Sequence, residues 1–249
     1  LTLLKVQGWD VSQDSNYKDI IYINSHRGSL EKSDAVIKGY ITFMDKASML
    51  VARLVNPQPG ERVLDCCAAP GGKSMYMAAL MDNTGSLMSC DIHEHKIALM
   101  ESNAQRLGIS IVQTKVQDAT ELPSAWKSYF DRVLVDVPCS GLGILQKKLD
   151  MRWRKDESTL SELPPLQLAI LERAAMTVKE KGYLVYSTCT LNYKENEDVV
   201  EAFLQKHKEF SIVPVGTDFP LQSNNGMITT YPPTDDMDGF FMVKMQRIS

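Results

Sequence analysis

From Arg62 onward, short apolar runs alternate with longer segments whose apolar residues recur at helical spacing. Each apolar run is bounded by turn residues, which predicts a strand. The predicted strands are residues 62–66, 85–90, 109–112, 132–135, 182–186 and 239–243. The helical pattern covers residues 73–81, 94–107, 166–178 and 195–206. Continuous apolar strands separated by helices predict an α/β fold, with a mostly parallel sheet and helices on both of its faces.

The first 60 residues follow a less regular pattern, and Pro57-Gln-Pro-Gly60 stands just before the alternating region. We therefore predict a small lead-in lobe over residues 1–60 and a sheet-containing catalytic domain over residues 61–249. The chain begins with Leu1 rather than methionine, and its first apolar residues are too few for the core of a signal peptide. From this we expect a fragment of a longer chain.

The composition narrows the class of protein. Apolar residues make up 44% of the chain and charged residues 23%, which excludes the disordered and fibrous classes. The net charge is −4, from 27 basic and 31 acidic residues, which argues against a uniformly basic surface but permits a local basic patch. No apolar run reaches the roughly 18 residues that span a bilayer, so we expect no membrane segment.

The cysteines and histidines indicate neither a disulfide framework nor a metal site. Five cysteines, two of them adjacent, do not make the even and spaced set that disulfides require. Reduced thiols in a cytoplasmic protein explain them better. The four histidines do not combine with these cysteines in a metal-binding spacing, so we expect no metal.

The segment Asp65-Cys-Cys-Ala-Ala-Pro-Gly-Gly-Lys-Ser74 joins the first predicted strand to a helix, and its small residues let a ligand approach the backbone. Its last residues resemble a phosphate-binding P-loop. However, Cys67 stands where that motif needs glycine, which disfavours an NTPase. The dinucleotide pattern G-x-G-x-x-G is also absent from this turn, which disfavours an NAD enzyme. The third candidate is an adenosine cofactor without phosphates, such as S-adenosylmethionine.

Two aspartates that follow the next strands suit such a cofactor. Asp91 follows Gly72 by 19 residues, in the register of an acid that binds ribose hydroxyls. Asp118 follows the third predicted strand, where it would meet the adenine amino group. The alternative is that both aspartates only cap the helices that come after them.

Two cysteines lie at the ends of the fourth and fifth predicted strands, in Asp136-Val-Pro-Cys139 and Ser187-Thr-Cys189. A thiolate is a strong nucleophile at neutral pH, and ligands of parallel sheets bind at the carboxyl ends of the strands. A lone cysteine in such a place is more often a small buried hydrophobe. No histidine lies beside either cysteine in the sequence, which disfavours a papain-like hydrolase.

Three ordered motifs together resemble the RNA cytosine-5 methyltransferase family: residues 66–73, 136–141 and 187–189. The resemblance runs from about Gly39 to the C-terminus and is greatest for the bacterial Sun/Fmu (RsmB) type, which modifies small-subunit ribosomal RNA. It implies a class I, Rossmann-like methyltransferase with a mostly parallel, seven-stranded sheet and a small N-terminal extension. It also implies S-adenosylmethionine as the cofactor and RNA as the partner.

The resemblance assigns roles to individual residues. Cys189 would be the nucleophile, and Cys139 would assist release of the enzyme from its product. The cofactor would be held by the glycine turn and the strand-end aspartates, namely Cys67, Ala68, Ala69, Pro70, Gly71, Gly72, Lys73, Asp91, Asp118 and Asp136. The chemistry adds a second role for Asp136, because a carboxyl group there could hydrogen-bond ring nitrogen 3 of the cytosine adduct.

Residues 147–155 form a basic segment after the motif that contains Cys139. The segment carries five basic residues and one acid, with a tryptophan inside it for base stacking. RNA contacts are predicted from Lys147, Lys148, Arg152, Trp153 and Arg154. The alternative is a solvated loop whose tryptophan packs inward.

These observations predict a monomeric, cytoplasmic enzyme that methylates carbon 5 of cytosine in 16S ribosomal RNA through a covalent cysteine adduct. We expect an RNA-binding domain to precede it in the longer chain. Two alternatives stay open: a transfer RNA methyltransferase with the same site, and a non-catalytic RNA-binding or ribosome-assembly module that retains cofactor binding. Intact Cys139 and Cys189 count against the second alternative.

Overall fold

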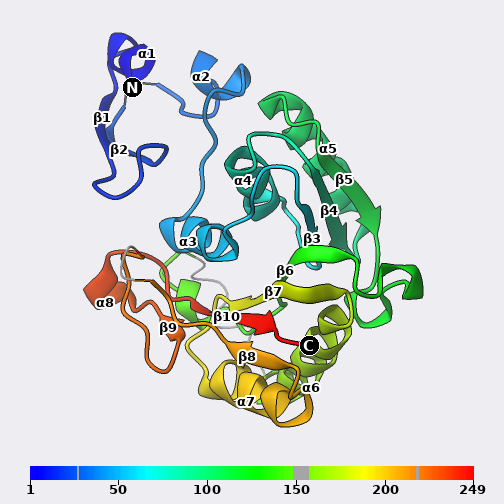
Figure 1. Cartoon of the computed structure of the whole chain (residues 1–249). Helices are drawn as coiled ribbons and strands as arrows, with labels where there is room; N and C mark the ends of the chain where they lie inside the picture. Colours follow the sequence, from blue (N-terminus) through cyan, green and yellow to red (C-terminus); the bar gives the residue numbers. More distant parts are fainter. Residues whose placement is uncertain (27, 148–156, 217–218) are drawn as a thin grey trace. The chain divides into compact units, whose positions relative to one another are not determined.

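The computed structural model describes residues 1–26, 28–147, 157–216 and 219–249 (Figure 1). These residues divide into two compact units, one made of residues 1–43 with 105–108 and the other of residues 44–104 with 109–249. The large sheet lies in the second unit, together with helix α3 (Lys46–Val55). The division into a lead-in lobe over 1–60 and a catalytic domain over 61–249 stays a prediction.

The first unit contains a two-stranded antiparallel hairpin and two short helices. Its elements are α1 (Thr2–Val6), β1 (Asp10–Gln13), β2 (Ile21–Ser25) and α2 (Asp34–Ile37). Its core consists of Leu4, Trp9, Val11 and Ala35. Residues 105–108 belong to this unit, where the Arg106 guanidinium donates to the carbonyl oxygens of Val36 and Ile41.

In the described part of the second unit, the sheet has eight strands. They are β3 (Arg62–Asp65), β4 (Ser86–Asp91), β5 (Val112–Val116), β6 (Phe130–Asp136), β7 (Val178–Thr188), β8 (Phe210–Ile212), β9 (Met227–Thr229) and β10 (Phe241–Arg247). Their order is β5-β4-β3-β6-β7-β10-β8, and β9 pairs with β10 outside this path. The first five strands of that order are parallel, and β10 is antiparallel to its neighbours. The predicted mostly parallel sheet is confirmed, but the predicted number of seven strands omits β9.

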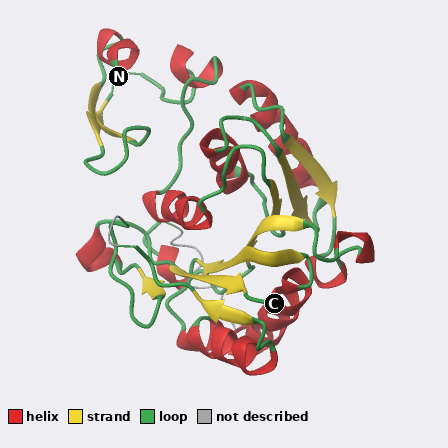
Figure 2. Cartoon of the chain, in the orientation of Figure 1, coloured by secondary structure: helices red, strands yellow, loops and turns green. Residues whose placement is uncertain are grey.

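Helices cover both faces of this sheet, with α3 and α4 on one side and α6 and α7 on the other (Figure 2). The helices of the unit are α3, α4 (Gly72–Leu80), α5 (Glu94–Leu107) as far as residue 104, α6 (Glu157–Ala175), α7 (Glu197–Lys206) and α8 (Pro232–Asp235). Leu184 and Tyr186 of β7 pack in one core cluster with residues of α6 and α7. Val185 between them points to the other face, because side chains alternate along a strand.

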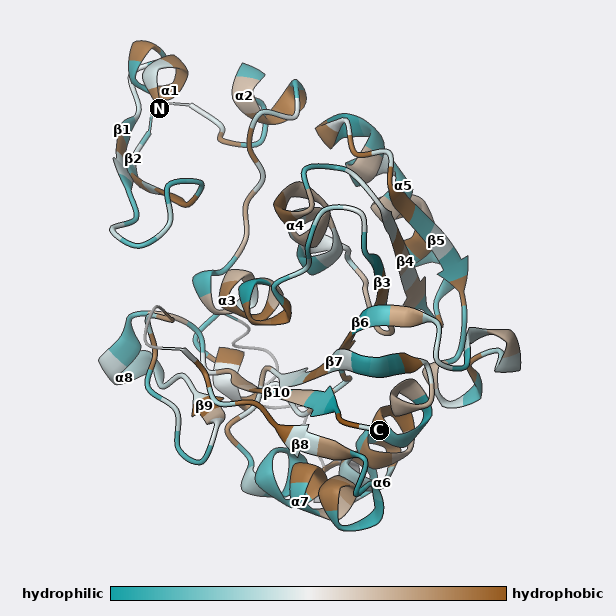
Figure 3. Ribbon diagram, viewed as in Figure 1, coloured by the Kyte–Doolittle hydropathy of each residue, from teal (hydrophilic) through white to brown (hydrophobic). Residues whose placement is uncertain are grey.

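Helix α7 is amphipathic: its apolar side faces the sheet and its charged side faces solvent (Figure 3). Its buried residues Val199, Val200 and Phe203 follow the helical spacing of one face. Among the described residues, no helix is both long enough and apolar enough to cross a membrane.

Several sequence-based boundaries differ from the structure, most clearly those of β5 and α6. The third predicted strand begins at Val112 rather than Ile109, because the turn after α5 extends through that segment. Helix α6 begins at Glu157, nine residues before the predicted start, and runs through Pro164 and Pro165. Prolines lack the N–H that an inner helical turn requires, so a helix through both is not expected from sequence alone. Helix α3, strand β8 and strand β9 lie in segments for which no element was predicted.

Two glycines allow the loop after β6 to lie against the start of β10. A Cβ atom on Gly143, which lies in the short 3-10 helix η3 (Leu142–Ile144), would stand 1.9 Å from the carbonyl oxygen of Gly239. The Gly143 N–H donates to the carbonyl oxygen of Cys189 at 3.0 Å, and the Gly239 N–H donates to that of Gly143 at 2.9 Å. The close approach therefore ties three loops together.

We predict that Gly143→Ala lowers the free energy of unfolding by about 1–3 kcal/mol, because the added methyl group overpacks this contact. Gly72→Ala is the control, since a Cβ there would be 4.0 Å from its nearest neighbour, the Met44 side chain. Chemical denaturation of both variants measures the difference. Equal stability of Gly143→Ala and the native chain would show that the loops separate without cost.

Candidate active site

The loops that follow β3, β4, β5, β6 and β7 surround a pocket of about 470 Å³ at the carboxyl edge of the sheet. Ligand pockets of this size are common at such an edge. Seven residues predicted for the site line it: Cys67, Ala69, Asp91, Asp118, Asp136, Cys139 and Cys189. The structure therefore brings three predicted aspartates and both strand-end thiols into one pocket.

The glycine turn closes one side of this pocket. The Gly71 N–H donates to the carbonyl oxygen of Ala68 at 2.7 Å, and Gly71 has a φ of +100°, which favours glycine. A Cβ on Gly71 would also stand 2.9 Å from Cγ of Met100. Ala68, Pro70, Gly71, Gly72 and Lys73 form the turn and the start of α4 without being among the pocket-lining residues of the described chain.

Asp118 is the N-cap of the 3-10 helix η1 (Ala119–Glu121), and its Oδ1 accepts the Thr120 N–H at 2.8 Å. Asp91 does not cap α5, but its Oδ1 accepts the His93 N–H at 2.9 Å just before that helix. Both aspartates also line the pocket, so these local hydrogen bonds are compatible with ligand binding. Lys96 Nζ lies 3.7 Å from Oδ1 of Asp91 and lines the same pocket.

Lys73 acts on the pocket through Asp136. Its ammonium group donates to Oδ2 of Asp136 at 2.6 Å, while the Ser187 hydroxyl donates to Oδ1 at 2.7 Å. Burial by itself would lower the pKa of Lys73, but the charge of Asp136 and the hydrogen bond to it raise this pKa above its usual value. The ion pair therefore holds the Asp136 carboxylate at the end of β6, an interaction that the sequence motifs did not reveal.

The two thiols are in direct contact. Sγ of Cys139 lies 3.1 Å from Sγ of Cys189, and the Cys189 N–H donates to Sγ of Cys139 at 3.3 Å. The hydrogen bond to Cys189, reinforced by burial, raises the pKa of Cys139 well above its usual value. Cys139 thus keeps its proton at neutral pH. Cys66 and Cys90, by contrast, belong to the hydrophobic core.

A buried carboxyl group lies under the glycine turn. Asp65, at the end of β3, is almost fully buried and accepts the hydroxyl of Ser74 at 2.7 Å. Ser74 in turn accepts the hydroxyl of Ser89 at 2.9 Å. Burial is the main cause that raises the pKa of Asp65 from 3.8 to about 7, which exceeds the lowering effect of the Ser74 hydrogen bond.

Of the basic segment, only Lys147 lies within the described residues. Its ammonium group pairs with Asp45, the N-cap of α3, at 2.5 Å and with Asp238, just before β10, at 2.9 Å. Lys147 thus fixes the start of the segment to two other elements of the unit. The predicted RNA contacts of Lys148, Arg152, Trp153 and Arg154 lie outside the described residues, and all five RNA contacts stay predictions.

Several pocket residues were not predicted from the sequence. Ile92, His93 and Lys96 lie within five residues after Asp91, so their position after a predicted strand is the signal that could have indicated them. Leu166 and Ile170 come from α6, and no sequence signal places that helix over the pocket.

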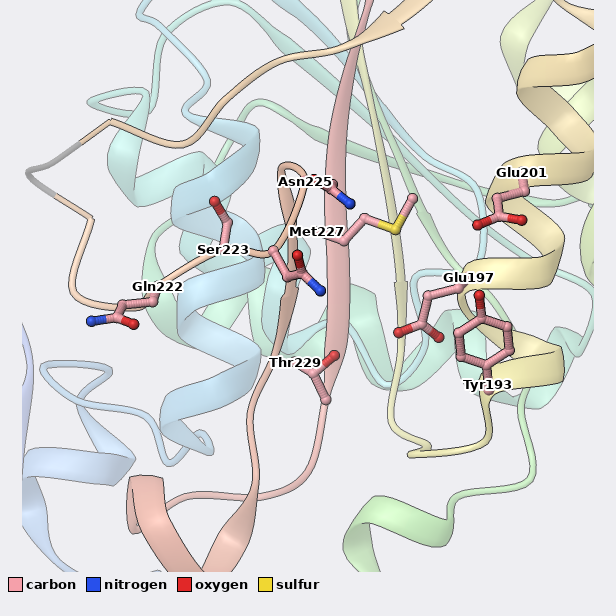
Figure 4. Close-up of a pocket in the computed structure, with 9 residues that line it drawn as sticks. Tyr193, Glu197, Glu201, Gln222, Ser223, Asn225, Met227 and Thr229 are labelled. Carbon is pink, nitrogen blue, oxygen red and sulfur yellow. The ribbon is translucent and has the colours of Figure 1, made fainter.

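A second pocket, also of about 470 Å³, lies between the start of α7 and strand β9 (Figure 4). Tyr193, Glu197 and Glu201 line one side of it, and polar residues around Met227 line the other. None of the residues predicted for the site lies in it. The chemistry of the predicted site therefore belongs to the first pocket.

Comparison with known proteins assigns the chain to a class and then to a family. A mostly parallel sheet with a glycine turn after β3 is a Rossmann-like arrangement, and the family model and structural neighbours place the chain in the class of S-adenosylmethionine-dependent methyltransferases. Residues 52–246 match the family model described as 16S rRNA methyltransferase RsmB/F. The chain belongs to this family, as the sequence motifs indicated.

Individual relatives agree with this assignment. "Probable ribosomal RNA small subunit methyltransferase B" of Bacillus subtilis is 36% identical over 98% of this chain and 54% of its own length. The human "28S rRNA (cytosine(4447)-C(5))-methyltransferase" is 35% identical over 86% of this chain and 28% of its own. NSun6 from Pyrococcus horikoshii, solved with SFG, shares 30% identity with a TM-score of 0.81, covering 90% and 57% of the two chains. The chain thus spans about half the length of the Bacillus relative.

The pKa of Asp65 predicts a pH dependence of stability. Because this pKa is raised on folding, the folded chain retains a proton that the unfolded chain has lost between about pH 4 and 7. The contribution of protonated Asp65 to the unfolding free energy is complete below pH 4 and is lost as the pH rises to 7. The unfolding free energy of the native chain, minus that of Asp65→Asn, should fall by up to about 1.4 kcal/mol per pH unit between pH 4 and 7. Urea denaturation from pH 5 to 8 measures it, and a difference that stays constant would contradict the raised pKa.

Proposed function

We propose that this chain methylates carbon 5 of cytosine in small-subunit ribosomal RNA, through a covalent adduct with Cys189. The observation that carries the proposal is the contact between two strand-end thiols in the pocket that Asp91 and Asp118 also line. The names of the Bacillus and human relatives support ribosomal RNA and cytosine carbon 5, respectively.

The residues around the pocket fit S-adenosylmethionine. Carboxylates at the ends of β4 and β5 suit the ribose hydroxyls and the adenine amino group, and the turn around Gly71 lets a ligand approach the backbone. Cys66, Cys67 and Ala69 are the turn residues that line the pocket. When bound, this cofactor supplies an electrophilic methyl group.

Cytosine carbon 5 is too weak a nucleophile to accept a methyl group without help. The Cys189 thiolate would form a bond to carbon 6, which makes the ring enamine-like and carbon 5 nucleophilic. After methyl transfer, carbon 5 must lose its proton to a base while the bond between Cys189 and carbon 6 breaks. Cys139 lies beside Cys189 and holds its proton at neutral pH, so it suits the role of acid in this release.

Asp136 would bind the polar edge of the base, with its carboxyl group held by Lys73. Both carboxylate oxygens of Asp136 accept hydrogen bonds in this structure, so a bond from Asp136 to ring nitrogen 3 requires a proton on the carboxyl group. The Lys73 ammonium group, which pairs with Oδ2, keeps this carboxyl group at the end of β6. The base must leave its stack to enter the pocket, which favours single-stranded or loop RNA.

We predict that Cys189→Ala abolishes methylation, whereas Cys139→Ala accumulates RNA bound covalently to the protein. The first variant lacks the nucleophile, and the second lacks the group that assists its release. A denaturing gel detects the covalent complex, and mass spectrometry of nucleosides detects the product. Cys90→Ala, which removes a thiol from the core, is the control. Covalent RNA on Cys189→Ala instead would reverse the two roles.

The RNA target has its own test. Bisulfite sequencing of RNA from cells that lack this protein should show one or more small-subunit ribosomal cytosines that have lost methylation. Loss confined to transfer RNA would contradict the proposed substrate and favour the transfer RNA alternative. No loss from any RNA would favour a non-catalytic module. The monomeric state, the cytoplasmic location and a preceding RNA-binding domain remain parts of this proposal.

A further inference from the structure

A buried carboxylate joins the two loops that carry the thiols. Glu195 ends the 3-10 helix η5 (Tyr193–Glu195) and is fully buried. Its Oε2 accepts the backbone N–H of Ser140 at 2.8 Å, and its Oε1 accepts the side-chain amide of Asn192 at 2.9 Å. Ser140 directly follows Cys139, and Asn192 lies three residues after Cys189. Glu195 therefore connects the Cys139 loop to the Cys189 loop.

The next residue holds the chain on both sides of Cys189. Asn196 is 2% exposed, and its Oδ1 accepts the Thr188 hydroxyl at 2.6 Å. Its Nδ2 donates to the carbonyl oxygen of Thr190 at 3.0 Å. Thr188 and Thr190 are the two chain neighbours of Cys189, so a single amide group fixes the backbone before and after the thiol.

Further buried contacts complete this network. Gln167 of α6 donates to Oε2 of Glu195 and to the carbonyl oxygen of Pro138, both at 3.0 Å. The hydroxyl groups of Ser140 and Thr190 lie 2.7 Å apart, which links the two loops a second time. These side chains are at most 3% exposed, so water does not replace a lost partner easily.

We propose that Glu195 and Asn196 are positioning residues that hold the Cys139 and Cys189 thiols in contact. Neither side chain lines the pocket, so each acts through the loops that it fixes. Their effect on methylation rests on the proposed function. The contact between the thiols does not depend on the proposed function, because oxidation measures it in the absence of RNA and cofactor.

The probe is disulfide formation by diamide, which takes two electrons and two protons from a pair of thiols as the sulfur–sulfur bond forms. Peptide mapping of the intact chain identifies the Cys139–Cys189 linkage and separates it from linkages of Cys66, Cys67 and Cys90. Its rate reports how often the two sulfur atoms meet in the correct geometry.

Thr188→Val and Thr177→Val form a matched pair. Both threonines are at most 2% exposed, and each hydroxyl donates one hydrogen bond, from Thr188 to Asn196 at 2.6 Å and from Thr177 to the carbonyl oxygen of Ala174 at 2.7 Å. Thr188→Val should slow disulfide formation by about 10-fold or more, as expected for misplaced reacting groups. Thr177→Val should lower the thermal stability about as much as Thr188→Val does, but it should leave the rate of disulfide formation unchanged.

Glu195→Ala and Glu195→Gln test the carboxylate. Glutamine retains an oxygen for Ser140 and Gln167, and the Asn192 amide is able to turn its own oxygen toward the new NH₂ group. Glu195→Ala should therefore slow disulfide formation and lower kcat by about 10-fold or more, with the KM for S-adenosylmethionine within about 3-fold. Glu195→Gln should restore most of both rates.

The outcomes separate this proposal from the proposed function. A folded Thr188→Val or Glu195→Ala that forms the disulfide at the native rate would overturn the positioning role. Equal slowing by Thr177→Val would also overturn it, because the effect would then follow general stability. Slowing by Thr188→Val alone, in a chain that methylates no cytosine, would retain the positioning role and reject the proposed function.

Discussion

The parallel pairing of β6 with β7 is the constraint on which the site depends. It aligns Asp136 with Ser187 at the carboxyl ends of the two strands. The Val137 N–H continues the pairing by donating to the carbonyl oxygen of Ser187 at 3.1 Å. Cys139 and Cys189 follow this aligned pair by three and two residues, respectively. A slip of one residue in the register would turn every side chain of one strand to the opposite face and separate the thiols.

Hydrogen bonds of polar side chains hold the loops that follow the paired strands. Asp136 is held by Lys73 and Ser187, whereas Glu195 is held by N–H donors from three different segments. A buried carboxylate is costly unless such donors satisfy it, so each one restricts the loops around it to a single arrangement. Cys139 and Cys189 lie between these two carboxylates in the sequence. The site is thus a rigid surface onto which a base and a cofactor would dock.

Much of this arrangement could be predicted from the sequence. The apolar runs located the strands from β3 to β7, and the rule that ligands bind at the carboxyl ends of parallel strands placed Asp91, Asp118, Cys139 and Cys189 at one edge. The contact between the thiols could not be predicted, because it depends on side-chain hydrogen bonds between segments about 50 residues apart. The role of Lys73 beside Asp136 was missed for the same reason. Strand β9 is only three residues long, too short for its pattern to indicate a strand.

The proposed function depends on the bond between Cys189 and carbon 6 of a cytosine in RNA, formed with Cys139 next to Cys189. An RNA substrate with fluorine in place of hydrogen at carbon 5 tests this directly, because release of Cys189 requires loss of a proton from that carbon. Incubation of the native chain with this RNA and S-adenosylmethionine, followed by peptide mapping, should locate the RNA on the peptide that contains Cys189. RNA attached to the Cys139 peptide, or methylated product without any covalent complex, would contradict the account.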